Sequence, residues 1–289
     1  MPELPEVETI RRDLEKKIAG HKIKIIEILA TKSVHNKSNE FKKILMTNNF
    51  KHIERRGKLL MFALGKVGKY AYLLVHLKMT GQLIYRNKIR LLAGGHSQTA
   101  MDTNVPNKFT RVIFTFSDGG QLFFNDLRRF GYLKLVSYEE KEKIVKNNFG
   151  IEPLTSDYTL EAFEKLFRKR QTNVKALLLN QKLIAGIGNI YADEACFDAH
   201  ILPFRKVNSL KPDEIRNLYH AIEHALKLSI KHRGTTFNNY VDSDGNTGSH
   251  INFLNVYGRD GEKCKRCKSM ILKKKHAGRG THYCAKCQK

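Results

Sequence analysis

Met1-Pro2-Glu3-Leu4-Pro5-Glu6-Val7-Glu8 opens the chain, and this stretch combines a helix start with a group of reactive side chains. Removal of Met1 would leave Pro2 with a free secondary amine, and an α-amino group titrates near pH ~8, well below a lysine amine. Part of it is therefore neutral at physiological pH and able to attack an aldehyde-like sugar carbon, forming a Schiff base. Glu3 is adjacent and Glu6 lies one helical turn further on, so both are candidate general acids or bases. An ordinary helix start gives the same pattern, because proline and acidic residues both favour a first turn.

A leading helix and a β-rich domain are predicted for the first half of the chain. Val7, Ile10, Leu14 and Ile18 recur at helical spacing, and Gly20 follows as a stop signal. Short apolar stretches separated by turn residues then predict a β-sandwich or barrel. These stretches are residues 22–30, 59–64, 70–77, 111–116, 121–124 and 130–136, and residues 87–108 are expected to form a long loop.

The pattern changes to helical periodicity in the second half. Residues 138–157 are expected to be a connection, because they contain glycine, proline and serine but little apolar periodicity. Helices are predicted after it, around residues 160–167, 174–179, 189–199 and 213–232. The fold class is therefore α+β, with an N-terminal domain over 1–137, a linker over 138–155, a helical domain over 156–250 and a cysteine-rich segment over 251–289.

The composition indicates an anionic polymer as partner. Lysine and arginine number 52 against 28 acidic residues, for a formal net charge of +24. Such an excess favours nucleic acid as the partner, although a surface that is basic for solubility has the same composition. The sequence has no signal-peptide pattern and no apolar run of bilayer length, so we expect a cytoplasmic protein without membrane contact.

Four cysteines near the C-terminus have the spacing of a metal site. Sixteen residues separate two C-x2-C pairs, which are Cys264 with Cys267 and Cys284 with Cys287. Four thiolates at this spacing predict one tetrahedral Zn²⁺ in a closed, structural site. Residues 273–275 and Arg279 between the pairs are basic, which favours binding of a phosphate backbone over binding of a protein.

Two weaker motifs also fit nucleic acid. Residues 184–193 (IAGIGNIYAD) place glycines before a helix start that attracts phosphate, although an ordinary interhelical turn is an alternative. Arg128 and Phe130, in residues 125–131 (NDLRRFG), could fill a duplex after a base leaves it. Surface arginines beside a core phenylalanine would look the same.

Together these motifs resemble a bacterial formamidopyrimidine-DNA glycosylase, a repair enzyme for oxidised purines. The similar stretches run in the family's order and are MPELPEVETIRR at the start, RRGKLL (55–60), HLKMTG (76–81), LRRFG (127–131), GIGNIYADE (186–194), TTFNNYVDSDG (235–245), VYGRDGE (256–262) and the zinc motif. The resemblance implies an N-terminal β-sandwich with a leading helix, then a helix–two-turn–helix domain with a lesion-capping loop and a C-terminal zinc-finger hairpin.

The resemblance also implies a role for each matching residue. Pro2 would be the nucleophile at the sugar C1′, Glu3 would move protons with support from Glu6, and Lys58 would hold a phosphate near the lesion. Further contacts to the DNA backbone are expected from His76, Lys175, Asn189, Tyr257 and Arg279. The gap left by a flipped base would be filled by Met79, Arg128 and Phe130, and the loop around Ser243 would close over the lesion.

The expected activity is base excision followed by β,δ-elimination, on double-stranded DNA that contains oxidised bases. We expect a monomer associated with the bacterial nucleoid. Two alternatives remain open at this point. One is endonuclease VIII-like specificity for oxidised pyrimidines, and the other is a zinc-finger protein that binds DNA without catalysis, as it would if Met1 stayed in place. Leu127 departs from the family, which often has proline there.

Overall fold

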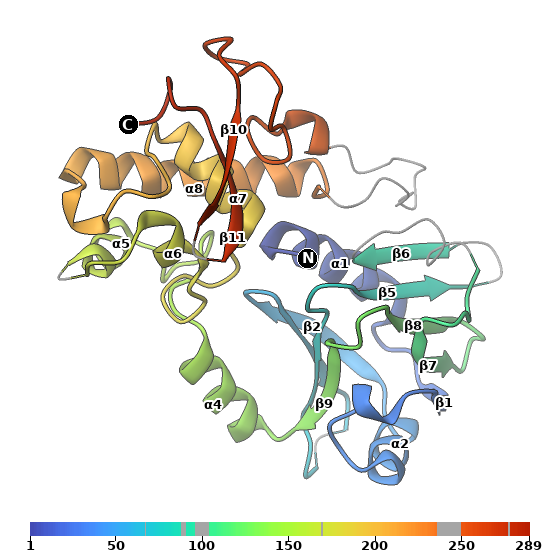
Figure 1. Ribbon diagram of the computed structural model, residues 1–289. Helices are drawn as coiled ribbons and strands as arrows, with labels where there is room; N and C mark the ends of the chain where they lie inside the picture. Colours follow the sequence, from blue (N-terminus) through green and yellow to red (C-terminus); the bar gives the residue numbers. More distant parts are fainter. Residues whose placement is uncertain (67, 88–90, 96–103, 169, 236–249, 277) are drawn as a thin grey trace. The chain divides into compact units, whose positions relative to one another are not determined.

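The computed structural model describes residues 1–66, 68–87, 91–95, 104–168, 170–235, 250–276 and 278–289 (Figure 1). The described chain forms two compact units. The first contains residues 1–145 together with 232–235, and the second contains residues 146–231 and 250–289. The segment expected to be one helical domain, 156–250, therefore contributes residues 232–235 to the N-terminal unit, and the cysteine-rich segment shares a unit with the helices.

The first unit is a β-sandwich with a leading helix. One sheet has the strand order β1-β7-β8-β5-β6 and the other has the order β2-β3-β4-β9, with antiparallel pairing throughout. The elements are α1 (Leu4–Ile18), β1 (Ile23–Ile28), α2 (Ser38–Met46), β2 (Phe50–Arg56), β3 (Leu59–Leu64), β4 (Tyr72–His76), β5 (Gly81–Arg86), β6 (Leu91–Gly95), β7 (Thr110–Phe116), β8 (Gln121–Asp126) and β9 (Tyr132–Val136).

Helix α1 is held by its apolar face, as the periodicity predicted. Val7, Ile10, Leu14 and Ile18 are each at most 3% exposed and join the core between the two sheets. Full burial of such a side chain stabilises a fold by roughly 1.5–3 kcal/mol, so packing rather than helix propensity fixes this helix. Its N-terminus, which carries Glu3 as N-cap, is thereby fixed on the sandwich.

The polar side of α1 is tied to β2 by a carboxylate. Glu8 accepts hydrogen bonds from Arg11 and Arg12 on its own helix and from Arg55 on β2, at 2.7–3.1 Å. Burial opposes ionisation of Glu8, but the guanidiniums of Arg11, Arg55 and Arg12 outweigh it and lower its pKa to about 2. Glu8 therefore stays ionised and links the helix to the sheet.

Three expectations for this unit need correction. Strand β2 and helix α2 were not predicted. In the case of β2 the reason is that it buries little besides Phe50 and Ile53 and so lacks a strong alternation of apolar residues. The expected loop over 87–108 contains strand β6, which pairs with β5. The expected connection over 138–157 begins with a helix, α4 (Tyr138–Asn148), whose buried residue is a lysine.

That lysine, Lys141, shows why α4 escaped detection. Its ammonium lies 3.5 Å from Glu54 and over the rings of Tyr72 and Tyr138. The helix is therefore attached to the sheet by charge and by cation–π contacts, which a search for apolar periodicity does not detect.

The second unit is helical with one β-hairpin. Its elements are α5 (Leu160–Phe167), α6 (Val174–Leu179), α7 (Asn189–Asp198), α8 (Pro212–Lys231), β10 (Leu272–His276) and β11 (Arg279–Tyr283). Helix α7 is buried on nearly all sides, and it contacts α6, α8 and β11. None of the described helices is both long and apolar enough to cross a membrane.

Candidate functional site

The chain's α-amino group lies in a buried cluster of charges. Glu3 is 2% exposed, Glu6 is fully buried and Lys58, just before β3, is 5% exposed. Burial lowers the pKa of the Met1 α-amino group; the carboxylates of Glu3 and Glu6 oppose this shift, and the ammonium of Lys58 adds to it. The structure thus brings together the N-terminus and three residues to which the resemblance assigned roles at the lesion. A terminal amine in this position has a larger neutral, nucleophilic fraction than one in water.

Glu6 has a structural task at each of its two oxygens. Oε2 accepts the backbone N–H of Glu3 at 2.9 Å, which caps the first turn of α1. Oε1 accepts the backbone N–H of Thr235 at 2.9 Å and its hydroxyl at 3.1 Å. Glu6 therefore holds both the N-terminal turn and Thr235, which lies three residues after the chain returns to this unit at His232.

His76, at the end of β4, is electrostatically coupled to the same cluster. Burial of the ring and the charges of Lys78 and Lys58 lower its pKa to about 3. Nδ1 accepts the backbone N–H of Lys78 at 3.0 Å, so the neutral ring carries its proton on Nε2. His76 is thus able to donate one hydrogen bond to a phosphate without contributing a charge.

The three residues expected to fill a gap in the duplex lie together. An N–H of Arg128 contacts the Met79 sulfur at 3.1 Å, and its guanidinium lies 4.8 Å from the centre of the Phe130 ring. Phe130 is 53% exposed, which excludes the alternative that it is a core residue. The trio therefore forms an exposed, mixed aromatic and cationic surface.

A buried carboxylate, Asp126, holds the loop that carries Arg128 and Phe130. Asp126 is fully buried and accepts hydrogen bonds from the Thr80 hydroxyl, from the Arg128 N–H at 3.2 Å and from the Gly131 N–H at 2.7 Å. The Thr80 hydroxyl oxygen also accepts the Arg128 N–H at 3.0 Å. Both ends of the exposed loop are thus fixed from beneath, and the turn before Thr80, which carries Met79, is fixed with them.

Backbone geometry confirms that these two turns are constrained. Lys78 and Arg129 have φ values of 51° and 57°, a left-handed conformation that costs a non-glycine residue roughly 1–2 kcal/mol. At Gly81 a Cβ would lie 2.4 Å from the Leu77 carbonyl oxygen, so only glycine permits the turn that presents Met79. Strain of this kind is common at functional sites, where the surrounding contacts offset it.

The four cysteines form a metal site in the second unit. Their Sγ atoms all lie within 4.8 Å of one another, with Cys264 to Cys287 at 3.8 Å and Cys267 to Cys284 at 3.4 Å. Tetrahedral Zn²⁺ with Zn–S bonds of about 2.3 Å requires sulfur separations of about 3.8 Å, so the residues fit this metal. Cys264 and Cys284 are fully buried, in a small core with Phe197, which makes the site a structural one.

The remaining expected DNA contacts of the second unit surround β11. Arg279 is exposed, whereas Asn189 and Tyr257 are partly buried. The amide of Asn189 donates to the Gly280 carbonyl at 3.0 Å, and the backbone N–H of Tyr257 is held by Glu194 at 2.9 Å. Lys175 is fully buried and lies 2.6 Å from the carboxylate of Asp193.

Ser243 and the expected lesion-capping loop, residues 236–245, lie outside the described residues. Several supporting residues were missed from the sequence, namely Thr80, Asp126, Asp193, Glu194 and Thr235. All five lie inside motifs that were recognised, but these motifs contain other polar residues as well, so no signal in the sequence singles the five out.

Family models match this chain over most of its length. The formamidopyrimidine-DNA glycosylase N-terminal domain matches residues 1–133, and the formamidopyrimidine-DNA glycosylase H2TH domain matches residues 149–240. A zinc finger found in FPG and IleRS matches residues 261–289. The three matches follow the order of the β-sandwich, the helices and the four-cysteine hairpin.

Relatives and solved structures agree over the full length. A formamidopyrimidine-DNA glycosylase of Pelotomaculum thermopropionicum is 42% identical, with 100% of this chain and 99% of the relative covered. The Listeria monocytogenes protein of the same name is 38% identical, with 100% of both covered. The crystal structure of a Lactococcus lactis FPG mutant in complex with a Fapy-dG containing DNA superposes with a TM-score of 0.87, at 37% identity and 100% coverage of both chains. Full-length similarity at this level, with the same domains in the same order, shows that the chain belongs to the formamidopyrimidine-DNA glycosylase family.

Proposed function

We propose that this DNA glycosylase excises oxidised purines from duplex DNA and then cuts the strand at the resulting abasic site. The observation that carries the proposal is the burial of the α-amino group among Glu3, Glu6 and Lys58. Similar solved proteins were captured with Fapy-dG, with an abasic site and with carbocyclic 8-oxo-G in DNA. The formal charge of +24 supports binding to an extended polyanion.

The proposed nucleophile is the secondary amine of Pro2 after removal of Met1. Pro2 is buried just before the first turn of α1, beside the carboxylates that surround the present terminus. Its nitrogen forms a bond to C1′ as the bond from C1′ to the damaged base breaks, and the base leaves with the bonding electrons and a proton. Opening of the sugar ring gives an iminium at C1′, which is the Schiff base.

Glu3 is the proposed proton carrier for these steps. It is next to the nucleophile in sequence and is 2% exposed, so bulk water has little access to exchange protons in its place. It protonates the ring oxygen as the sugar opens, and the iminium then acidifies the C2′ proton. Removal of that proton expels the 3′ phosphate by β-elimination, and a second elimination expels the 5′ phosphate.

The trio of Met79, Arg128 and Phe130 is proposed to fill the duplex while the damaged base is out of the stack. C1′ is shielded in stacked DNA, so the nucleotide must flip before the amine reaches it. Phe130 is the apolar wedge, and Arg128 is the donor to the base that lost its partner. Lys58 and the Nε2–H of His76 are proposed to bind the phosphates next to the flipped nucleotide.

Zn²⁺, when bound by the four cysteines, supplies folding free energy to the hairpin and takes no part in the chemistry. We further propose that the chain acts as a monomer on the nucleoid, since the proposed substrate is chromosomal DNA. Sedimentation of the protein with and without duplex tests the monomer.

Borohydride trapping tests the proposed function. The protein is incubated with an 8-oxoguanine duplex and sodium borohydride, and the adduct is mapped by mass spectrometry. We expect a covalent link at Pro2, loss of the link in Glu3→Gln, and normal trapping in the exposed control Glu27→Gln. An adduct that maps to a lysine contradicts the assignment of the nucleophile. No adduct supports a binding-only protein, and stronger trapping on an oxidised pyrimidine supports the endonuclease VIII-like alternative.

A further inference from the structure

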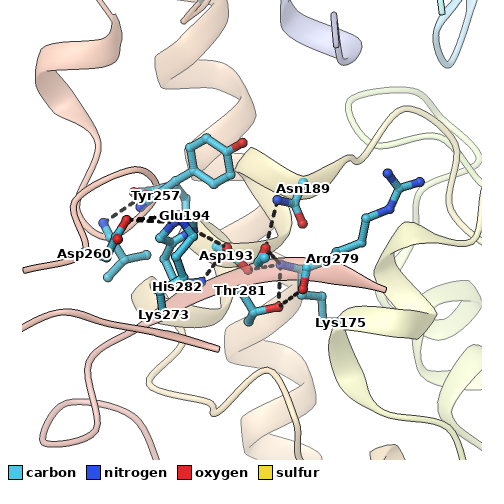
Figure 2. Close-up of polar contacts among 12 residues, drawn as sticks. Lys175, Asn189, Asp193, Glu194, Tyr257, Asp260, Lys273, Arg279, Thr281 and His282 are labelled. Atoms are coloured by element: carbon cyan, nitrogen blue, oxygen red, sulfur yellow. Dashed lines mark hydrogen bonds and ion pairs between the residues drawn. The ribbon is translucent and has the colours of Figure 1, made fainter. Parts of the chain in front are cut away.

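Strand β11, which carries Arg279, is fastened to two helices by a buried polar cluster (Figure 2). The ammonium of Lys175, on α6, lies 2.6 Å from Oδ1 of Asp193, on α7. It also donates to the Gly280 carbonyl at 3.1 Å and to the Thr281 hydroxyl at 3.0 Å. Both charged side chains are fully buried. The residues that follow Arg279 are thus bonded directly to the interior of the unit.

The same carboxylate holds the next residue of the strand. Oδ2 of Asp193 accepts the backbone N–H of His282 at 2.9 Å, and the His282 ring lies 3.2 Å away. From the first turn of α7, Asn189 donates to the Gly280 carbonyl at 3.0 Å. Three consecutive residues, 280 to 282, therefore have their positions set by α6 and α7.

The described polar contacts of Lys175 all lie inside the cluster. Its ammonium donates to the Gly280 carbonyl and the Thr281 hydroxyl, and it forms an ion pair with the Asp193 carboxylate. Because the side chain is fully buried among these partners, Lys175 is not placed to bind a phosphate. Arg279 is the opposite case, because its side chain is exposed and extends away from the cluster (Figure 2).

We propose that Lys175 and Asp193 are positioning residues. They do not contact DNA themselves, but they fix the strand from which the guanidinium of Arg279 binds a backbone phosphate. This inference rests on the proposed function of Arg279. A hydrogen bond to a phosphate forms only over a narrow range of distance and angle. A strand that is held at three successive residues keeps the start of the Arg279 side chain in place without DNA. The cost of ordering the arginine is thereby lowered before binding.

A double-mutant cycle tests this role. Binding to a duplex with a tetrahydrofuran abasic analogue is measured at several salt concentrations for wild type, Lys175→Met, Arg279→Ala and the double variant. Loss of one phosphate contact lowers the salt slope by about 0.9. We expect Arg279→Ala to weaken binding on the order of ten-fold and to show this drop in slope. Lys175→Met should weaken binding in the wild-type background but add no further loss, and no further change in slope, once Arg279 is absent.

A lysine that bound its own phosphate would behave differently. Lys175→Met would then weaken binding by the same factor in both backgrounds, and the double variant would lose a second slope increment of about 0.9. That result overturns the inference and leaves the proposed function intact. If Arg279→Ala binds like wild type, the phosphate role of Arg279 itself fails. The exposed Lys211→Met is the matched control, since it removes one charge of the same unit without touching β11.

A paired variant serves as the control for misfolding of Lys175→Met. Removing one member of a buried ion pair leaves an uncompensated charge, whereas removing both is often tolerated. If Lys175→Met loses zinc or its cooperative melting transition, the cycle is repeated with Lys175→Met/Asp193→Asn, which has neither charge. The paired variant should also add no loss in the Arg279→Ala background, and an additive loss there overturns the inference.

Discussion

Asp126→Asn perturbs the loop that carries Arg128 and Phe130 without changing either of these exposed side chains. The carboxylate accepts hydrogen bonds from the Thr80 hydroxyl and from the backbone N–H groups of Arg128 and Gly131. Asparagine has a single acceptor oxygen, and its NH₂ group must face one of these donors. Losing a hydrogen bond to a charged group costs about 1.5–3 kcal/mol, and a buried unpaired N–H adds about 1–3 kcal/mol. We expect the first unit to lose about 2–4 kcal/mol of unfolding free energy, since these costs overlap.

The assay combines urea unfolding with amide hydrogen exchange of residues 127–131 and with excision opposite each of the four bases. In Asp126→Asn the amides of Arg128 and Gly131 should exchange faster, and the preference for cytosine opposite the lesion should weaken. Asp118→Asn is the control, because Asp118 is exposed and also accepts a backbone N–H in a turn, at 3.0 Å from Gly120. It should stay within about 0.5 kcal/mol of wild type. Wild-type unfolding and wild-type exchange in Asp126→Asn would refute the view that this carboxylate holds the loop.

Four other outcomes follow from the site and the fold. Glu3→Gln should lose base excision but keep its affinity for undamaged duplex, and a wild-type excision rate would remove Glu3 from the mechanism. Cys264→Ser should release zinc and weaken binding to every duplex, which zinc analysis and binding assays check, because thiolates hold the closed site. Arg128→Ala should relax the preference for cytosine opposite the lesion by roughly 1–3 kcal/mol. Arg279→Ala should instead weaken binding alike for all four opposite bases and flatten the salt dependence of binding. The reverse pattern would exchange the roles of the two arginines. Glu8 has its pKa lowered from 4.5 to about 2 in the folded state, so its stabilising effect is present above pH 4.5 and is lost as the pH falls towards 2; Glu8→Gln should therefore flatten the pH dependence of the urea midpoint in that range.

Local patterns made much of the fold predictable. The apolar face of α1 and the cysteine spacing are properties of short stretches, and both predictions were confirmed by the structure. Strand β2 and helix α4 were missed because charge contacts replace apolar burial there, as at Lys141. Hydrophobic periodicity is a weak signal for elements that attach to a sheet through polar side chains.

The supporting residues of the site were beyond the reach of sequence motifs. Asp126 meets Thr80 across 46 positions, and Asp193 meets His282 across 89. A polar residue reveals such a task only when its partner is known, and tertiary folding decides the partner. Lys175 illustrates the same limit, because the sequence alone does not show its ion pair with Asp193.

The contact between Glu6 and Thr235 bears on the order in which the protein can be made. It joins residues 229 positions apart. Contacts between distant residues carry a higher loop-closure entropy and form late in folding. On the ribosome the N-terminus emerges first, yet Glu6 gains this partner only after residue 235 has been synthesised. A nascent or truncated chain that stops within the helices therefore carries the reactive terminus without its finished surroundings. Such a chain already contains Glu3, Glu6 and Lys58, but Oε1 of Glu6 lacks the two donors that Thr235 supplies.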